Sequence, residues 1–221
     1  MDKETFLQKY INIETKTFIR TEKNKKLDDL LKDHEINKAK LTSTDILEII
    51  DYLTAENITI RQPLFNDLIY PILSEQVENN NVNAIKGLLK LDQHLLSYQG
   101  YTKNYKYTIR TLLEKGLLIS PNDNDLLKLS ENMTREYLIY TLHEIPAGVL
   151  YGSNGTTIEG CEELIKETDN YEILCNKLQI DKSELINKCR YYYSAYRNYL
   201  SVSKNYINFS DYLHKECKGL K

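Results

Sequence analysis

Apolar residues recur at intervals of three and four along nearly the whole chain. The C-terminal stretch shows the spacing i, i+4, i+7 and i+11, carried by Val202, Tyr206, Phe209 and Leu213. Such spacing places side chains on one face of a helix, whereas a half-buried strand requires alternation of apolar and polar residues. The runs at 58–60 and 117–119 allow an extended conformation but are too short to build a sheet. The sequence therefore predicts an all-α fold.

Breaks and capping residues divide this pattern into roughly ten helices joined by short turns. The expected helical segments are residues 2–20, 25–34, 43–56, 63–77, 82–98, 102–115, 120–130, 134–144, 158–168, 171–178, 182–200 and 202–217. Proline inside a helix removes a backbone donor, so Pro71 predicts a kink or a break after Tyr70. The expected helix N-caps are Ser43 or Thr44, Thr134 and Asp181, and the expected C-terminal cap is Gly116.

Helices with short connections lie antiparallel to their neighbours, so we expect a single domain of residues 1–221 built from antiparallel helical hairpins. The tetratricopeptide signature of spaced Trp, Gly, Tyr, Ala and Pro is absent, which leaves an irregular bundle and a short solenoid-like stack both open. The glycine-rich segment 148–157 is the best candidate for a sub-domain division. Residues 137–142, shortly before it, are apolar almost all round, which predicts a central buried helix.

Charge limits the classes of partner. The formal net charge is −3, so the chain as a whole has no electrostatic attraction to nucleic acid or to an anionic membrane. The one local basic cluster is residues 16–26, which we interpret as a solvated helix end and loop because Asp28 and Asp29 follow at once. Nucleic-acid binding is therefore the least favoured function, and no membrane partner is expected.

The sequence also indicates the compartment. No apolar run approaches the roughly 20 residues needed to span a bilayer, and the charged N-terminus lacks the apolar region of a signal peptide. The four cysteines are Cys161, Cys175, Cys189 and Cys217, and no two of them form a C-x-x-C pair. We expect a cytoplasmic protein with reduced thiols, without metal or cofactor.

The segment from His143 to Gly155 is the least generic part of the chain. His143-Glu144 resembles the start of a zinc-protease motif, but position 147 is Ala and Pro146 breaks the helix, so the second histidine is missing. The glycine-rich loop lacks the lysine of a phosphate-binding loop. An alternative function remains: a small-ligand-binding protein or hydrolytic enzyme in which His143 is the acid or base and Glu144 orients it.

Cys161 is the one cysteine whose position suggests nucleophilic chemistry. It follows Gly160 near a predicted helix N-terminus, which lowers a thiol pKa, but the adjacent Glu162 and Glu163 raise it again. A cysteine nucleophile also needs a nearby base. We interpret Cys161 as an inert, partly buried thiol.

Tyrosine is abundant, with 18 Tyr against 4 Phe and no Trp. The densest run lies in 191–199, where helical spacing assigns one stripe to the core: Cys189, Tyr192, Tyr193, Tyr196, Tyr199 and Leu200. Tyr191 lies outside this stripe. Arg190 and Arg197 are seven residues apart, so they lie on the same face of the helix. An exposed tyrosine beside arginines is the composition of protein-binding hot spots.

The leading hypothesis is a non-enzymatic protein that binds another protein. Its most concrete version is a bacterial immunity protein that neutralises a cognate toxin, because a small, mildly acidic chain without catalytic spacing suits a basic toxin domain by charge complementarity. The candidate contact residues are Tyr191, Arg190 and Arg197 together with Glu159, Glu162 and Glu163. A helical-repeat scaffold is a further alternative.

Overall fold

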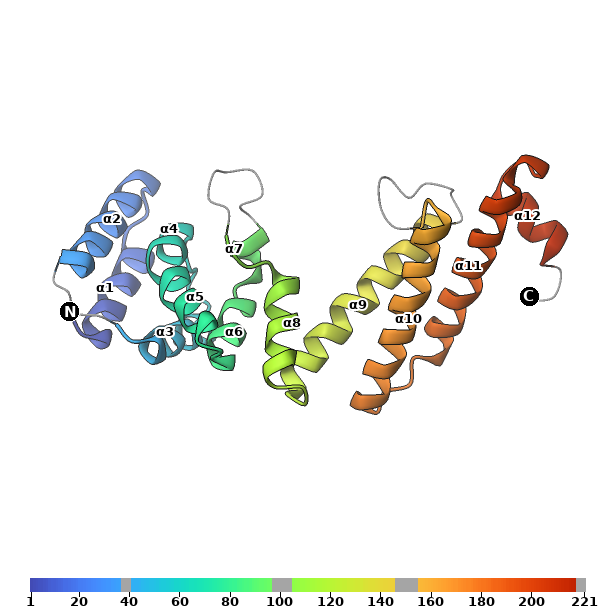
Figure 1. The fold of residues 1–221 in the computed structure, drawn as a ribbon. Coiled ribbons are helices and arrows are strands. Elements are labelled where there is room, and N and C mark those ends of the chain that lie inside the picture. Colours follow the sequence, from blue (N-terminus) through green and yellow to red (C-terminus); the bar gives the residue numbers. More distant parts are fainter. Residues whose placement is uncertain (37–40, 97–104, 146–154, 218–221) are drawn as a thin grey trace. The chain divides into compact units, whose positions relative to one another are not determined.

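A computed structural model of the chain describes residues 1–36, 41–96, 105–145 and 155–217 (Figure 1). These residues form helices, turns and connecting segments and contain no strand, which confirms the predicted all-α fold. The chain divides into two compact units, Met1–Pro121 and Asn122–Lys221, and each is described by itself. The segment 148–157, expected as a point of division, falls within the second unit, and residues 146–154 lie outside the described part.

The first unit begins with α1 (Lys3–Lys16) and α2 (Arg20–Ile36). Asp2 caps α1 by accepting the Thr5 backbone N–H at 2.8 Å. The prediction that the first helix extends to residue 20 is wrong, because Thr17 has an extended backbone with φ −111° and ψ 116°. The second helix correspondingly begins five residues earlier than predicted.

Helix α3 (Ser43–Ala55) forms within the predicted segment 43–56 and buries one face, made of Ile46, Ile49, Ile50 and Leu53. Its N-cap is Thr42, so the prediction of Ser43 or Thr44 is wrong by one or two residues. The Thr42 hydroxyl accepts the Asp45 backbone N–H at 3.2 Å, and the Asp45 carboxylate accepts the Thr42 backbone N–H at 2.8 Å. This reciprocal capping box satisfies two donors that an uncapped helix end leaves unpaired.

The chain then runs through α4 (Gln62–Leu64), a π-helical turn (Phe65–Ile69) and α5 (Tyr70–Glu78). Pro63 stands in the first turn of α4, where its missing N–H leaves no helical hydrogen bond unmade. The irregularity expected at Pro71 takes the form of the wider π turn directly before it. A proline in a helix lacks the N–H that would reach back four residues and crowds the carbonyl there.

Helices α6 (Val82–Leu89), α7 (Asp92–Leu96) and α8 (Ile109–Ile119) complete the first unit. The predicted single helix over 82–98 is interrupted between α6 and α7, and α8 begins after its N-cap Thr108 rather than at residue 102. Gly116 is not a C-terminal cap. It is buried inside α8, which continues through the residues 117–119 that the sequence left open as extended.

The second unit begins with α9 (Asn124–Glu144), a single helix where two were predicted. Asp123 caps it, and Thr134 lies in its interior rather than at an N-cap, because no proline or glycine breaks the segment. The expectation that residues 137–142 are buried all round is also wrong. Leu138, Thr141 and Leu142 face the core, whereas Tyr140 is 54% exposed.

Helix α10 (Ile158–Leu178) is also continuous where a break near residue 170 was predicted, and it ends at Gln179 in the left-handed conformation. Helix α11 (Ser183–Val202) follows a cap position occupied by Lys182, although the Asp181 carboxylate does accept the Ser183 N–H at 2.9 Å. The predicted last helix is a 3₁₀ turn (Ser203–Asn205) followed by α12 (Phe209–Glu216).

Helix α10 packs against both α9 and α11 and supplies the centre of the second unit's core. The residues of that core with less than 2% exposure are Leu138, Ile145, Cys161, Leu164, Tyr171, Cys189 and Tyr193. No helix within the described residues is both long enough and apolar enough to cross a membrane.

Candidate functional site

The His143–Glu144 pair lies at the end of α9. The His143 Nδ1 and Glu144 Oε1 atoms are 3.1 Å apart, and the His143 side chain is 85% exposed. Among the described residues, Glu144 is the polar partner of this imidazole. The rest of the segment proposed as a site, residues 146–154, lies outside the described part, so the alternative of a catalytic or small-ligand site here stays a prediction.

Cys161 lies in the first turns of α10 and is fully buried. Its thiol donates to the Gly155 carbonyl oxygen at 3.4 Å. Burial raises the pKa of the Cys161 thiol to about 11, so the thiolate needed for nucleophilic attack is scarce at neutral pH. This agrees with the interpretation of Cys161 as an inert thiol.

The tyrosine stripe of α11 packs as predicted. Cys189, Tyr193 and Tyr196 are buried in the core, and Tyr192, Tyr199 and Leu200 are half-buried against it. The aromatic cluster continues onto α12, where the Tyr196 and Phe209 rings meet edge to face with centroids 4.8 Å apart. The stripe is therefore structural.

Tyr191 is half-buried rather than exposed. Its ring meets the Tyr192 ring edge to face, with the centroids 5.2 Å apart. Burial and the neighbouring Cys217 side chain raise the pKa of Tyr191. The surface that this tyrosine offers to a partner is smaller than the sequence suggested.

The two arginines beside Tyr191 differ in how firmly they are held. Arg190 Nη2 lies 2.6 Å from both Asp169 Oδ1 and Glu172 Oε2, which ties α11 to α10. These hydrogen bonds raise the pKa of Arg190. Arg197 Nη1 lies 3.9 Å from Glu162 Oε1, a loose contact between half-exposed side chains. Arg197 is therefore the more available of the two for a partner.

The three predicted contact carboxylates all lie exposed on the first two turns of α10. Glu162 has the loose contact with Arg197, whereas Glu159 and Glu163 have no ion pair with any described cation. Ile158, at the start of the same helix, is 38% exposed. The structure thus presents uncompensated negative charge beside a partly exposed apolar side chain.

A second exposed surface of this unit was missed by sequence reasoning. On α9 the side chains of Met133, Tyr137, Ile139 and Tyr140 are 36% to 54% exposed. The sequence placed the last three of these in the core because the segment is apolar on every side. Exposed tyrosines with apolar neighbours are the kind of side chains that anchor protein interfaces.

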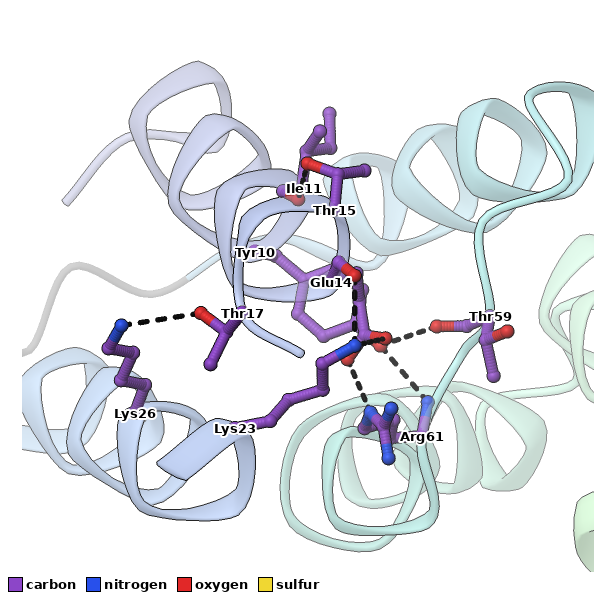
Figure 2. A network of polar contacts seen from close by, with 9 residues as sticks. All are labelled: Tyr10, Ile11, Glu14, Thr15, Thr17, Lys23, Lys26, Thr59 and Arg61. Atoms are coloured by element: carbon purple, nitrogen blue, oxygen red, sulfur yellow. Dashed lines mark hydrogen bonds and ion pairs between the residues drawn. The ribbon is translucent and has the colours of Figure 1, made fainter. Parts of the chain in front are cut away.

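The first unit contains a buried polar network that joins α1, α2 and the segment before α4 (Figure 2). The Glu14 side chain is only 6% exposed and lies between two cations, Arg61 Nε and Lys23 Nζ. The Lys23 ammonium also donates to the Glu14 carbonyl oxygen at 2.8 Å. A buried carboxylate requires such partners because losing its hydration is costly.

Tyr10 completes this network. Its hydroxyl donates to the Thr59 carbonyl oxygen at 2.7 Å and accepts the Arg61 backbone N–H at 3.0 Å. Burial raises the pKa of Tyr10, so the phenol stays neutral. Each hydroxyl, carboxylate and ammonium of the network has a protein partner, and its role is to fix the α1–α2 turn against the rest of the unit.

A second group of polar and aromatic side chains in the first unit surrounds the π-helical turn. The Gln62 amide nitrogen donates to the Tyr105 hydroxyl at 2.8 Å, and its oxygen lies 2.9 Å from His94 Nδ1. The His94 ring stacks on Phe65 with centroids 4.9 Å apart, and burial lowers the pKa of the imidazole. Sequence analysis did not single out His94. Its one signal here was Pro71, which predicted an irregular helix, and π-helical turns are frequent at functional sites.

Comparison with known proteins adds no assignment. No family model matches the chain, and neither a curated protein nor a solved structure matches it. Within the described residues no three His, Cys, Asp or Glu side chains are grouped so as to hold a metal ion. The functional proposals therefore depend on the surfaces of the two units.

Proposed function

We propose that the protein acts by binding another protein, most concretely as a bacterial immunity protein that neutralises a basic toxin domain. The exposed, uncompensated carboxylates at the start of α10 carry this proposal. Glu159 and Glu163 are free of ion pairs with described residues, and Glu162 is held only loosely. The proposed contact surface consists of these three glutamates, Arg197 and Ile158.

The distribution of charge supports a contact on the second unit. Lys and Arg balance Asp and Glu in Met1–Pro121, so the whole formal charge of −3 belongs to Asn122–Lys221. A surface of one sign steers an oppositely charged partner and raises the association rate. A basic toxin domain is such a partner.

Apolar area for a stable complex is present in the same unit. Interfaces combine a charged rim with a few buried aromatic or aliphatic anchors. Ile158 stands beside the glutamates, and the exposed residues of α9 include Tyr140 and Ile139. These side chains are the candidate anchors, and the glutamates are the steering charges.

A growth-rescue experiment tests the proposal. Each gene adjacent to the one for this chain is expressed in a host alone and together with it. We expect one neighbour to encode a toxic, basic domain and co-expression to restore growth. Calorimetry on the purified pair should then give a Kd that the double variant Glu159→Lys/Glu163→Lys raises by about tenfold or more.

Glu184→Lys is the control matched in charge to the single variant Glu159→Lys, which also reverses one glutamate in the first turn of a helix. Glu184 is exposed in the first turn of α11, so its reversal has the same cost at a helix N-terminus but lies at the other end of the α10–α11 pair. The proposal is wrong if no neighbouring gene product is toxic, or if the Glu159→Lys variant binds its toxin as tightly as the Glu184→Lys variant does.

A further inference from the structure

The turn between α1 and α2 displays two large apolar side chains. Phe18 is 90% exposed and Ile19 is 63% exposed. Single exposed apolar residues are common on soluble proteins, whereas two consecutive ones at a helical turn form a small apolar protrusion. The sequence predicted a helix through residue 20, whereas the extended backbone at Thr17 ends α1 before Phe18.

Lys16 and Arg20 flank this protrusion in the chain, Lys25 follows in the second turn of α2, and none of the three has an ion-pair partner among the described residues. All three side chains are exposed. The two nearby carboxylates are already engaged: Glu14 by Lys23 and Arg61, and Glu22 by Lys26 at 2.8 Å. The tip of the turn is therefore positively charged, although the unit as a whole is neutral.

The network of Figure 2 holds the turn in this conformation. Thr17 is buried, and its hydroxyl accepts the Lys26 ammonium at 3.3 Å. The Lys23 backbone N–H donates to the Ile19 carbonyl oxygen at 2.9 Å. The Lys23 ammonium donates to the Glu14 carbonyl oxygen. Phe18 and Ile19 are thus displayed by a well-anchored backbone.

The charge of the whole chain led to the expectation of no membrane partner, but the local charge of this turn differs from it. We propose that this turn is a peripheral contact with an anionic lipid bilayer. Phe18 and Ile19 enter the boundary between headgroups and acyl chains, and Lys16, Arg20 and Lys25 bind the headgroup phosphates. Apolar side chains combined with a basic surround are the composition of segments that lie on anionic membranes.

Charge and shape favour a bilayer over other polyanions. A nucleic acid would gain from stacking on Phe18, but the aliphatic Ile19 offers no stacking surface and adds apolar area only. The pair also protrudes from a turn, which suits insertion into a fluid interface. Asp28 and Asp29, whose position led to the expectation of a simple solvated helix end, lie one turn beyond Lys25 on α2 and partly offset its charge, whereas Lys16 and Arg20 leave the tip basic.

The contact is expected to be weak and reversible. Two side chains bury little apolar area, and each nearby cation strengthens binding by about fivefold at an anionic surface. Because the charges are exposed, salt should weaken the binding strongly. The turn therefore serves as a positioning contact and needs a second attachment for stable anchoring.

The absence of Trp from the chain allows a direct test. Phe18→Trp places the only indole of the protein at the tip, and Ile207→Trp places it at a comparably exposed residue (87%) in the other unit. Both are mixed with phosphatidylcholine vesicles, with and without phosphatidylglycerol. We expect a blue shift of emission for Phe18→Trp on the anionic vesicles only, and no shift for Ile207→Trp.

Vesicle co-sedimentation gives the independent measurement. The variants Phe18→Ser/Ile19→Ser and Lys16→Gln/Arg20→Gln/Lys25→Gln should each lose binding by about tenfold or more, whereas Ile207→Ser should not. The proposal fails if the Trp at position 18 stays solvent-exposed on anionic vesicles. It also fails if Phe18→Ser/Ile19→Ser binds as the parent does, or if the tip binds RNA but no vesicles. Circular dichroism confirms that these surface variants are folded.

Discussion

The Tyr193 and Thr141 hydroxyl oxygens lie 2.6 Å apart in the core of the second unit, joining α11 to α9. The Thr141 hydroxyl also contacts the Leu138 carbonyl oxygen at 3.0 Å, and the Tyr193 hydroxyl reaches the same oxygen at 3.3 Å. Both residues are fully buried. The two hydroxyls have no contact with solvent, and they form a hydrogen bond with each other instead. Burial raises the pKa of Tyr193.

Replacing Tyr193 by Phe should lower the free energy of unfolding by about 1 kcal/mol, because a buried hydrogen bond is lost while the ring remains. Urea denaturation measures the change. Tyr192→Phe on the same helix is the control, since Tyr192 is half-buried without a hydrogen bond to a described residue. A double-mutant cycle with Thr141→Val should show coupling, and additive losses would contradict the assigned contact.

Glu14→Gln should destabilise the protein by about 2 to 3 kcal/mol, since the substitution leaves Lys23 and Arg61 without their buried counter-charge. The Lys23 and Arg61 side chains are only 12% and 27% exposed. Glu22→Gln is the control, because its pair with Lys26 is exposed and worth about 0.5 kcal/mol at most. Equal midpoints of unfolding for both variants would show that the Glu14 network adds nothing beyond a surface pair.

The helical fold followed from residue spacing, but the helix boundaries did not. Periodicity located the buried stripe of α11 because its apolar residues recur regularly on one face. The extra breaks predicted inside α9 and α10 did not occur. Polar residues such as Thr134 also fit a helix interior when packing on the opposite face continues. Capping residues alone indicate helix ends only weakly, because the burial of a continuous helix face in the folded unit outweighs them.

The candidate surfaces were predicted less well than the fold. Sequence reasoning could place Glu159 and Glu163 on one exposed helix turn because charge and period agree. It could not show that Arg190 is held by two carboxylates, because those contacts depend on how α10 and α11 pack. Sequence reasoning also missed the exposure of Phe18 and Tyr140. An apolar residue is assigned to the core by default, and only the position of the neighbouring helix shows whether it is covered.

Glu78 predicts a pH dependence of stability in the first unit. Its carboxylate accepts hydrogen bonds from Lys106 Nζ and the Tyr107 hydroxyl, and these hold the pKa of Glu78 below its usual range. A lowered pKa in the folded state adds stability that is present above the unfolded pKa of about 4.3 and is lost as pH falls through the folded value. The thermal midpoint should therefore fall on acidification.

The variant Glu78→Gln tests the origin of this acid sensitivity. Thermal unfolding followed from neutral pH to below pH ~4 should show a shallower decline than in the parent protein. Glu75→Gln on the same helix lacks both hydrogen bonds and should behave as the parent does. A Glu78→Gln curve parallel to the parent curve would exclude this carboxylate as the source.

The four cysteines should differ in reactivity. Cys161, Cys175 and Cys189 are at most 2% exposed, and burial raises the pKa of all three thiols. Cys217 is partly exposed. Titration with a thiol-specific chromogenic reagent at neutral pH should label one cysteine quickly and the other three only after unfolding in urea. The variant Cys217→Ser should abolish the fast phase, and a remaining fast thiol would show that a buried cysteine is accessible.

Gly87 on α6 lies close to side chains of two other helices in the first unit. A Cβ atom there would overlap with Leu47 Cδ2 on α3 and lie 3.2 Å from Leu73 Cδ1 on α5. Alanine gains about 0.5 to 1 kcal/mol over glycine inside a helix. The overlapping atom is the end of the half-buried Leu47 side chain, which has to shift, while the fully buried Leu73 cannot make room. We therefore expect the cost to exceed this gain and Gly87→Ala to be net destabilising by about 1 kcal/mol.

A smaller side chain at position 47 tests whether the overlap with Leu47 causes the loss of stability in Gly87→Ala. In a Leu47→Ala background the main overlap is gone, so Gly87→Ala should become close to neutral or stabilising. Urea denaturation of the two single variants and the double variant gives the coupling free energy. If Gly87→Ala destabilises equally in both backgrounds, the cost arises from the contact with Leu73 or from the backbone, and the close approach of Leu47 is not its source.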